Sequence, residues 1–267
     1  MDYWVFDLIF LALPAALLLR GRRVPRALLG ATAALAAVAL LWTAPWDEHL
    51  VRTGVWSYGP DRVLATVGSV PAEEYAFVVL LVVLVAAWGL RTGRLPSLPV
   101  VASGSRTTGA LAWLAVALTG AAAVAAGGQL RYLGLLLVWV APPLALQRAV
   151  AGDLLRPRLA DRALLALPVA LWLCAADRLA LADGIWSIAP ASSTGVLVLG
   201  LPLEEGLFFL LTTWLVADGL VLATDHRALA RAHALVTRRP TPLPTPPRAP
   251  IMESLPGAHA QRPAPAP

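Results

Sequence analysis

The sequence predicts an all-α protein, a multi-pass transmembrane helical bundle of about seven spans, with two parallel three-helix repeats joined by a linking helix. Three observations support this prediction. Apolar residues make up 58% of the 267 residues and charged residues 14%, against roughly 45 to 50% and about 25% in a soluble domain. The apolar residues fall in blocks of about 20, which is the length of a membrane-crossing helix. One pattern of residues also occurs twice along the chain.

Each apolar block is expected to form a helix, because only a helix satisfies all its backbone hydrogen bonds within one segment inside a bilayer. The alternation of apolar and polar residues typical of membrane β-strands is absent from these blocks. The seven blocks cover residues 4–19, 27–45, 71–90, 108–126, 130–147, 162–181 and 203–223.

Arginine indicates how these helices are oriented. The loops after the first, third and fifth blocks and the segment after the seventh are rich in arginine, whereas the other loops mix arginine with acidic residues. Arginine-rich loops remain on the cytoplasmic side. We therefore expect a plasma-membrane protein with its N-terminus outside and its C-terminus in the cytoplasm. The tail, residues 227–267, is expected to be disordered, because Pro, Ala and Thr dominate from about Arg238.

The internal repeat defines the domain organisation. Ten residues of the first copy, Trp42, Asp47, Gly54, Val55, Trp56, Ser57, Pro71, Glu73, Glu74 and Phe77, recur as Trp172, Asp177, Gly184, Ile185, Trp186, Ser187, Pro202, Glu204, Glu205 and Phe208. The predicted units are a first repeat (1–95), a linking transmembrane helix (96–128) and a second repeat (129–226), followed by the tail. The linking helix adds one crossing, so both repeats are expected to have the same orientation and both acidic motifs the same, outer, depth.

Each repeat contains a Pro-x-Glu-Glu motif at the expected start of its third helix. A proline at the first helical position followed by acids is typical of a helix N-terminus, where the acids can simply complement the helix dipole. Adjacent residues point about 100° apart on a helix, so one acid of each pair should face the bundle interior. Two nearby buried carboxyls do not easily ionise together, so at least one is expected to hold a proton and to be able to act as a general acid.

Two further groups of residues have alternative roles. Asp47 and Asp177 lie near Arg52 and Arg178, and either form interfacial ion pairs or belong to the same site as the glutamates. The repeated tryptophans are either interface anchors or aromatic walls that stabilise a cation through their ring faces.

Several classes of protein are excluded. The chain has no lysine, which excludes the Schiff base of a retinal-binding opsin, and its one cysteine, Cys174, supports neither a disulfide framework nor a cysteine-rich metal site. An intramembrane protease of the Glu-Glu-x-x-x-Arg type would need arginine where Val78 and Phe209 stand. Magnesium-binding aspartate clusters are absent, so no metal site is expected. No nucleic-acid partner is expected either, because the basic residues are scattered between the apolar blocks instead of forming one basic face.

With its repeated Pro-x-Glu-Glu-x-x-x-Phe segments and the upstream Asp and Gly-Val/Ile-Trp residues, the sequence resembles the small membrane lycopene cyclases of bacteria, archaea and fungi over residues 1 to about 225. In that family two homologous three-helix units, separate or fused, form one cyclase, and this chain resembles the fused form. The resemblance implies carotenoid biosynthesis: a proton-initiated, redox-neutral cyclisation of lycopene that forms the β-ionone rings of γ-carotene and β-carotene without a cofactor. The implied partners are lycopene or a similar hydrophobic polyene, the lipid bilayer and other carotenoid enzymes.

The resemblance also implies roles for the site residues. Glu204 and Glu73 are expected to act as acid and base, Glu205 and Glu74 to support them, and Asp47 and Asp177 to orient them. The substrate-binding residues are expected to be Trp56, Trp186, Phe77, Phe208 and Tyr75. Two alternatives stay open, namely a related membrane terpene or carotenoid cyclase acting on another polyprenyl substrate, and a non-enzymatic membrane transporter or scaffold.

Overall fold

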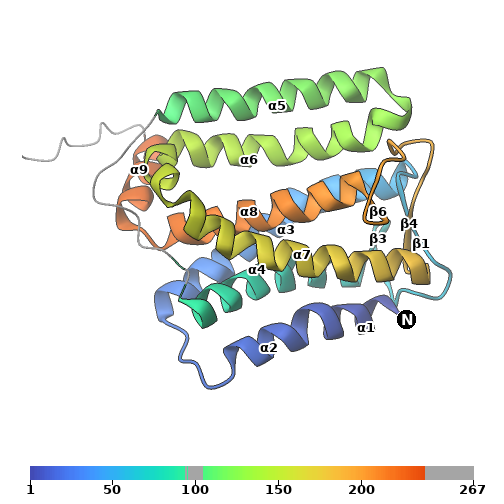
Figure 1. Ribbon diagram of the computed structural model, residues 1–267, viewed down its shortest axis with the longest axis horizontal. Helices are drawn as coiled ribbons and strands as arrows, with labels where there is room; N and C mark the ends of the chain where they lie inside the picture. Colours follow the sequence, from blue (N-terminus) through green and yellow to red (C-terminus); the bar gives the residue numbers. More distant parts are fainter. Residues whose placement is uncertain (94, 96–104, 238–267) are drawn as a thin grey trace, which may run out of the picture.

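The computed structural model describes residues 1–93, 95 and 105–237, and this part of the chain is mainly α-helical (Figure 1). The first repeat contains α1 (Tyr3–Asp7), a π-helical turn (Leu8–Ala12), α2 (Leu13–Leu19), α3 (Arg26–Arg52) and α4 (Ala72–Thr92). The second contains α6 (Arg131–Leu155), α7 (Leu159–Asp183) and α8 (Leu203–Ala223). Helix α5 (Arg106–Ala126) lies between the repeats, α9 (His226–Thr237) follows them, and two 3₁₀ turns cover Gly128–Leu130 and Arg156–Arg158. The predicted all-α class is confirmed.

Five helical segments are long and apolar enough to cross a membrane: Arg26–Arg52, Ala72–Thr92, Arg106–Ala126, Gly128–Asp183 and Leu203–Ala223. The segment Gly128–Asp183 contains two helices, α6 and α7. The N-terminal segment Tyr3–Leu19 is also apolar but shorter. Each predicted apolar block therefore coincides with a helical segment, whereas the number of crossings stays a prediction.

Short strands, which the sequence did not predict, shape the connection between the second and third helix of each repeat. These are β1 (Trp56–Tyr58), β2 (Thr66–Val67) and β3 (Val70–Pro71) in the first repeat, and β4 (Trp186–Ile188), β5 (Leu197–Val198) and β6 (Leu201–Pro202) in the second. The pairs β2–β3 and β5–β6 are tight hairpins whose two-residue turns include Gly68 and Gly200, both with positive φ.

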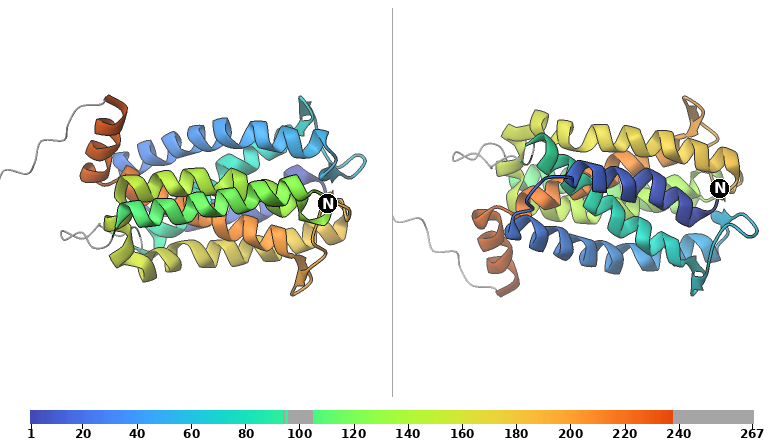
Figure 2. Two further views of the ribbon diagram at one scale, coloured as in Figure 1. Left: turned by 90° about the horizontal axis from the view of Figure 1, so that it is seen from above. Right: turned by 90° about the horizontal axis from the view of Figure 1, so that it is seen from below.

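Strands β1 and β4 pair antiparallel and join the two repeats. Ser57 stands opposite Ser187, and their hydroxyl oxygens are 2.9 Å apart. Equivalent residues of the two repeats therefore meet at one point, as expected around an approximate two-fold axis. Both loops lie at the same end of the bundle as the N-terminus (Figures 1 and 2), so the two Glu-Glu motifs begin their helices side by side.

Helix α5 forms a hairpin with α6 and lies at the edge of the bundle (Figure 1). The two helices approach closely because each has a glycine at the contact: a Cβ on Gly134 would lie 2.7 Å from the carbonyl oxygen of Gly120. Helices α4 and α8 pack against each other between the repeats. Residues 96–104 of the predicted linking unit lie outside the described residues.

Two predictions about charged segments need correction. Arg162 stands at the first position of the block 162–181, and the arginine pattern groups it with Arg156 and Arg158 in the loop before that block. The structure instead places Arg162 in α7, where it is buried and its guanidinium lies 2.5 Å from the carboxyl of Asp218, which also pairs with Arg148 at 3.0 Å. The first part of the tail is helical rather than disordered, because Ala228 of α9 is buried and Arg231 pairs with Asp153 of α6 at 2.8 Å. The rest of the predicted tail, residues 238–267, lies outside the described residues.

Candidate active site

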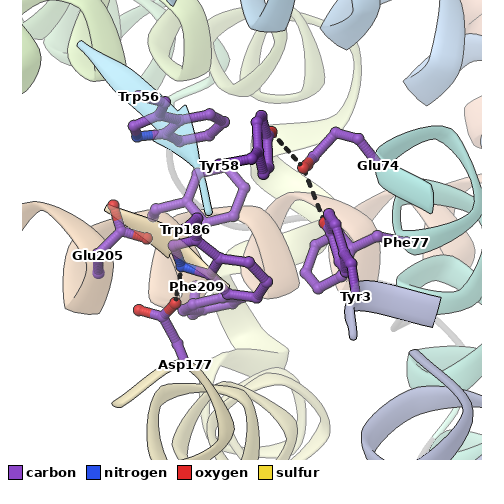
Figure 3. A pocket seen from close by; sticks show the side chains of 10 residues that line it. Tyr3, Trp56, Tyr58, Glu74, Phe77, Asp177, Trp186, Glu205 and Phe209 are labelled. Carbon is purple, nitrogen blue, oxygen red and sulfur yellow. Dashed lines mark hydrogen bonds between the residues drawn. The ribbon is translucent and has the colours of Figure 1, made fainter. Parts of the chain in front are cut away.

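A pocket of about 350 Å³ lies beneath the paired strands β1 and β4, where the two repeats meet (Figure 3). Three carboxyl side chains and seven aromatic ones line it: Glu74, Asp177 and Glu205 together with Tyr3, Trp56, Tyr58, Phe77, Trp186, Phe208 and Phe209. Both repeats contribute to its wall, and no arginine or histidine belongs to its lining. Within the described residues, no group of three or more His, Cys, Asp or Glu could hold a metal ion.

Glu74, in the first turn of α4, is held by two tyrosines. The hydroxyl of Tyr3 donates to Glu74 Oε2 at 2.7 Å, and that of Tyr58 donates to the same oxygen at 3.0 Å (Figure 3). Tyr58 lies in β1, outside the helices, and its burial, together with the nearby carboxyl of Glu74, raises the pKa of its phenol well above the ordinary value. It therefore stays protonated and remains a donor at neutral pH.

Glu205, the equivalent residue of α8, has a different environment. Tyr132, at the start of α6, donates to Glu205 Oε1 at 2.5 Å. The neighbouring carboxyl is that of Asp177, whose Oδ1 accepts a hydrogen bond of 2.8 Å from the indole nitrogen of Trp186 (Figure 3). Asp177 Oδ2 has no donor among the described residues.

The other two glutamates hold the loops instead of lining the pocket. Glu73 Oε1 accepts a hydrogen bond of 2.7 Å from the backbone N–H of Leu64, and Glu204 Oε1 accepts one of the same length from Thr194. Both glutamates are buried. The expected supporting residues, Glu74 and Glu205, therefore line the pocket. The expected acid and base, Glu204 and Glu73, precede them by one residue in the sequence and do not line it.

Neither aspartate pairs with its neighbouring arginine. Arg52 instead lies 3.9 Å from Glu48, and Asp47 and Asp177 are both buried. The ion-pair interpretation is therefore wrong for the described residues, because burial separates these aspartates from the exposed arginines of the helix ends. Asp177 lines the pocket, whereas its repeat equivalent Asp47 does not.

Four of the five expected substrate-binding residues line the pocket: Trp56, Trp186, Phe77 and Phe208. Tyr75 does not, since its hydroxyl donates to the carbonyl of Val67 at 3.2 Å. The tyrosines that hold the carboxyls and the ring of Phe209 were not predicted from the sequence. A signal for two of them exists: Tyr3 and Pro14 recur as Tyr132 and Pro143 with the same eleven-residue spacing, which extends the repeat upstream.

A second, largely apolar cavity of about 880 Å³, here called the channel, lies next to the pocket between α3, α4, α6 and α8. It shares Phe77 and Phe208 with the pocket. Val38 and Leu146, which also line it, are 61% and 60% exposed on the outer face of the bundle. The channel therefore extends from two phenylalanines of the pocket to an apolar outer surface.

The family model described as Lycopene cyclase matches residues 2–88 and 131–217. These segments contain the two halves of the pocket, and they confirm the internal repeat. The chain is 42% identical over 192 residues to a lycopene beta-cyclase of Halobacterium salinarum, covering 70% of this chain and 79% of that protein.

Two fungal relatives match a smaller part of their own length. A bifunctional lycopene cyclase/phytoene synthase of Phycomyces blakesleeanus is 36% identical over 220 residues, covering 78% of this chain and 35% of that protein. The equivalent protein of Arthroderma gypseum is 32% identical over 232 residues, covering 76% and 38%. No solved structure matches the chain. The family model covers both repeats and the archaeal relative most of the chain, so this chain belongs to the lycopene cyclase family.

Proposed function

We propose that the chain is a lycopene β-cyclase, which converts the acyclic ψ-ends of lycopene to β-ionone rings. The observation that carries this proposal is the pocket itself: carboxyls from both repeats line an aromatic pocket, and an apolar channel lies next to it on the other side of Phe77 and Phe208. The name of the archaeal relative, lycopene beta-cyclase, supports the same activity.

The reaction needs one acid and one base. The acid gives a proton to the terminal double bond, which forms a C–H bond and leaves a tertiary cation. The neighbouring alkene attacks this cation and closes the ring, which moves the positive charge to a ring carbon. The base then removes a proton from the adjacent ring carbon, and the new double bond forms. Substrate and product are isomers, so no electrons are exchanged.

The residues of the pocket match these steps. Glu74 and Glu205, with Asp177 beside Glu205, are the carboxyls within reach of a substrate end. The faces of Trp56, Trp186 and the pocket phenylalanines stabilise the cationic intermediates. We assign Glu73 and Glu204 the role of holding the loops that cover the pocket. Asp47, which lies near Glu74 in the first repeat, is assigned the role of orienting that glutamate.

The channel is suited to the straight polyene behind the reacting end. Its walls run along α8 from Phe208 to Val216, about 12 Å at the usual helical rise of about 1.5 Å per residue. The rest of a long polyene would extend from the exposed mouth into the surrounding lipid. This arrangement lets an end enter the pocket without drawing the whole chain out of the membrane.

We further propose seven membrane crossings in the plasma membrane, with the N-terminus outside and the tail in the cytoplasm. The arginine distribution and the five long apolar helical segments support this topology, with Tyr3–Leu19 as the first crossing and α6 and α7 as separate ones. The proposed units remain the repeats 1–95 and 129–226 with the linking helix 96–128 between them. Other enzymes that act on carotenoids are the proposed partners.

A second candidate is a related cyclase whose substrate carries an oxygen. Among the described residues, Trp139 Nε1, Gln147 Oε1 and Thr212 Oγ1 are buried without a hydrogen-bond partner, and all three residues line the largely apolar channel. A buried polar atom without a partner costs about 1 to 3 kcal/mol, and a hydroxyl or carbonyl of a substrate would satisfy it. This candidate requires a preference for an oxygenated polyene over lycopene.

Expression in a lycopene-accumulating host, followed by pigment chromatography, tests the proposal. Wild-type protein should convert lycopene to γ-carotene and β-carotene, and Glu205→Gln protein present at equal membrane level should not. Unchanged lycopene with well-folded wild-type protein would contradict the proposed activity. A parallel assay with a hydroxylated acyclic carotenoid separates the two candidates by their relative kcat/KM.

A further inference from the structure

The two repeats place equivalent carboxyls in the pocket but surround them with different groups. Glu74 and Glu205 each follow the proline of their motif by three residues. Each also accepts a hydrogen bond from the tyrosine at the start of its own repeat, Tyr3 or Tyr132. Perfect symmetry would make the two carboxyls interchangeable, so any division of labour must come from positions where the repeats differ.

The first difference is Tyr58, whose equivalent in the second repeat is Ile188. Each of them stands two residues after the repeated tryptophan of β1 or β4. The Tyr58 hydroxyl gives Glu74 Oε2 a second phenol donor at 3.0 Å, and Ile188 has no polar atom to offer Glu205. Two donors on a carboxylate oxygen stabilise the ionised form, which is the form that accepts a proton.

The second difference is the neighbouring aspartate. Asp177 lines the pocket beside Glu205, fully buried and with Oδ2 free of any donor among the described residues, whereas Asp47 stays outside the lining. Two carboxyls that line one small pocket without a cationic lining residue do not easily ionise together, so one of them is expected to hold a proton. The pair of Asp177 and Glu205 therefore holds a proton that it can give.

Other titratable groups also approach these carboxyls. Asp7 of α1 and Asp47 of α3 lie near Glu74, Tyr3 and Tyr58 donate to it, and Glu204 precedes Glu205 in α8. Both oxygens of Asp7 and one of Asp47 lack a donor among the described residues. A buried carboxyl without donors favours the neutral form, so these two aspartates do not oppose a charge on Glu74.

We infer, on the basis of the proposed function, that the proton crosses the pocket in one direction: the Glu205–Asp177 pair protonates the terminal alkene, and Glu74 removes the proton that leaves the closed ring. Two C=C π bonds are consumed as one C–H and one C–C bond form, and one π bond is re-formed as a C–H bond breaks, so Glu74 ends the cycle protonated and the pair deprotonated. Between turnovers Glu74 releases its proton to water and the pair takes one proton up from water, and no oxidant or reductant takes part. Tyr58 is the positioning residue that sets this direction.

The isomers formed by two variants of the full-length protein test the direction. Glu205→Gln should lower total cyclised product by at least about 100-fold, since no acid starts the reaction. Glu74→Gln should still protonate lycopene, so its closed cation loses a different proton, and rings with the double bond elsewhere should become a larger share of the product. The opposite assignment of these two phenotypes would overturn the inference.

A kinetic isotope effect covers the case in which both glutamine variants are inactive. Lycopene deuterated at the alkene carbon that later loses its hydrogen should react more slowly than unlabelled lycopene in Glu74→Asp protein, because proton removal limits the rate there. Glu205→Asp protein should show a small effect. Equal isotope effects in both variants would overturn the proposed direction.

Tyr58→Phe tests the positioning role, because it keeps the ring and removes the second donor. We expect kcat to fall on the order of 10-fold with KM nearly unchanged, and the isotope effect to rise. Tyr75→Phe, which removes a phenol outside the pocket, is the matched control and should leave kcat unchanged. A Tyr58→Phe protein with normal kcat would overturn this role. Failure of wild-type protein to cyclise lycopene would instead contradict the proposed function, so the two failures are distinguishable.

Discussion

At the scale of single residues, two glutamates that are adjacent in sequence have separate tasks. Glu74 and Glu205 face the pocket, while Glu73 and Glu204 accept hydrogen bonds from the backbone of the covering loops. A difference of about 100° around the helix separates the two directions. The sequence identified the Glu-Glu motifs as the centre of the site, but it could not show which member faces inward, because the register of α4 and α8 depends on packing between distant segments.

The loop-holding pair can be tested by single substitutions. In Glu73→Gln and Glu204→Gln the amide oxygen can still accept the backbone N–H, so we expect turnover to stay within about 10-fold of wild type, and the melting temperature in detergent to fall modestly, since one hydrogen bond to a charged group contributes about 1.5 to 3 kcal/mol. Turnover and thermal unfolding are measured on the same preparations. A loss above 100-fold at an unchanged melting temperature would assign proton transfer to these residues.

The two aspartates offer a comparison between equivalent positions. Asp177→Asn removes a carboxyl from the pocket lining and should lower turnover by about 100-fold or more, in the range expected for loss of a proton-transfer partner. Asp47→Asn changes a buried carboxyl outside the lining and should have a smaller effect on turnover. Similar losses in both variants, measured as lycopene conversion per folded protein, would contradict the asymmetry of the pocket.

At the scale of elements, paired strands and helix packing build the site. The β1–β4 pair places Trp56 and Tyr58 of one repeat opposite Ile188 and Trp186 of the other. These strands were not predicted, because each has only three residues and forms its ladder with a segment far away in sequence. The helices were predicted well, since their apolar blocks are long and each one is a local property of the chain.

The channel between α3, α4, α6 and α8 can be tested at its mouth. Leu146 lines the channel, and its repeat equivalent Leu17 lines a groove on the other side of the bundle; the two residues are 60% and 56% exposed. Leu146→Trp should narrow the channel and lower kcat/KM for lycopene severalfold, whereas Leu17→Trp should not. Equal effects of the two substitutions in detergent assays would show that the polyene does not occupy this channel.

At the scale of the whole molecule, duplication explains the single site. Each repeat supplies one pocket glutamate and the equivalent tyrosine donor, Tyr3 or Tyr132, and the strand pairing places both glutamates at one end of the bundle. The repeat was visible in the sequence, as were the residues that carry it. The importance of the difference between Tyr58 and Ile188 could not be predicted from the sequence, because it depends on the positions of the two carboxyls in the folded protein.

The topology is tested by labelling single cysteines in a Cys174→Ala background. Arg22→Cys lies between α2 and α3. Leu64→Cys lies in an exposed part of the loop between β1 and β2, at the end of the bundle that holds the pocket. Gly59 is unsuitable as a reporter, since a Cβ there would lie 2.2 Å from the carbonyl oxygen of Gly184. An impermeant reagent should label Leu64→Cys from outside the cell and Arg22→Cys only after lysis. Labelling of both from one side would contradict the proposed arrangement of crossings.

The central claim, that buried carboxyls start and finish an isomerisation, is tested most directly by the product formed in deuterated water. Purified wild-type protein, supplied with lycopene and no nucleotide or flavin, should form β-carotene that carries one solvent deuterium per ring, at the ring carbon derived from the protonated alkene. The initiating proton comes from an exchangeable carboxyl, so the label must appear in mass and NMR spectra of the product. Cyclised product without deuterium, or a strict requirement for a stoichiometric reductant, would contradict the mechanism.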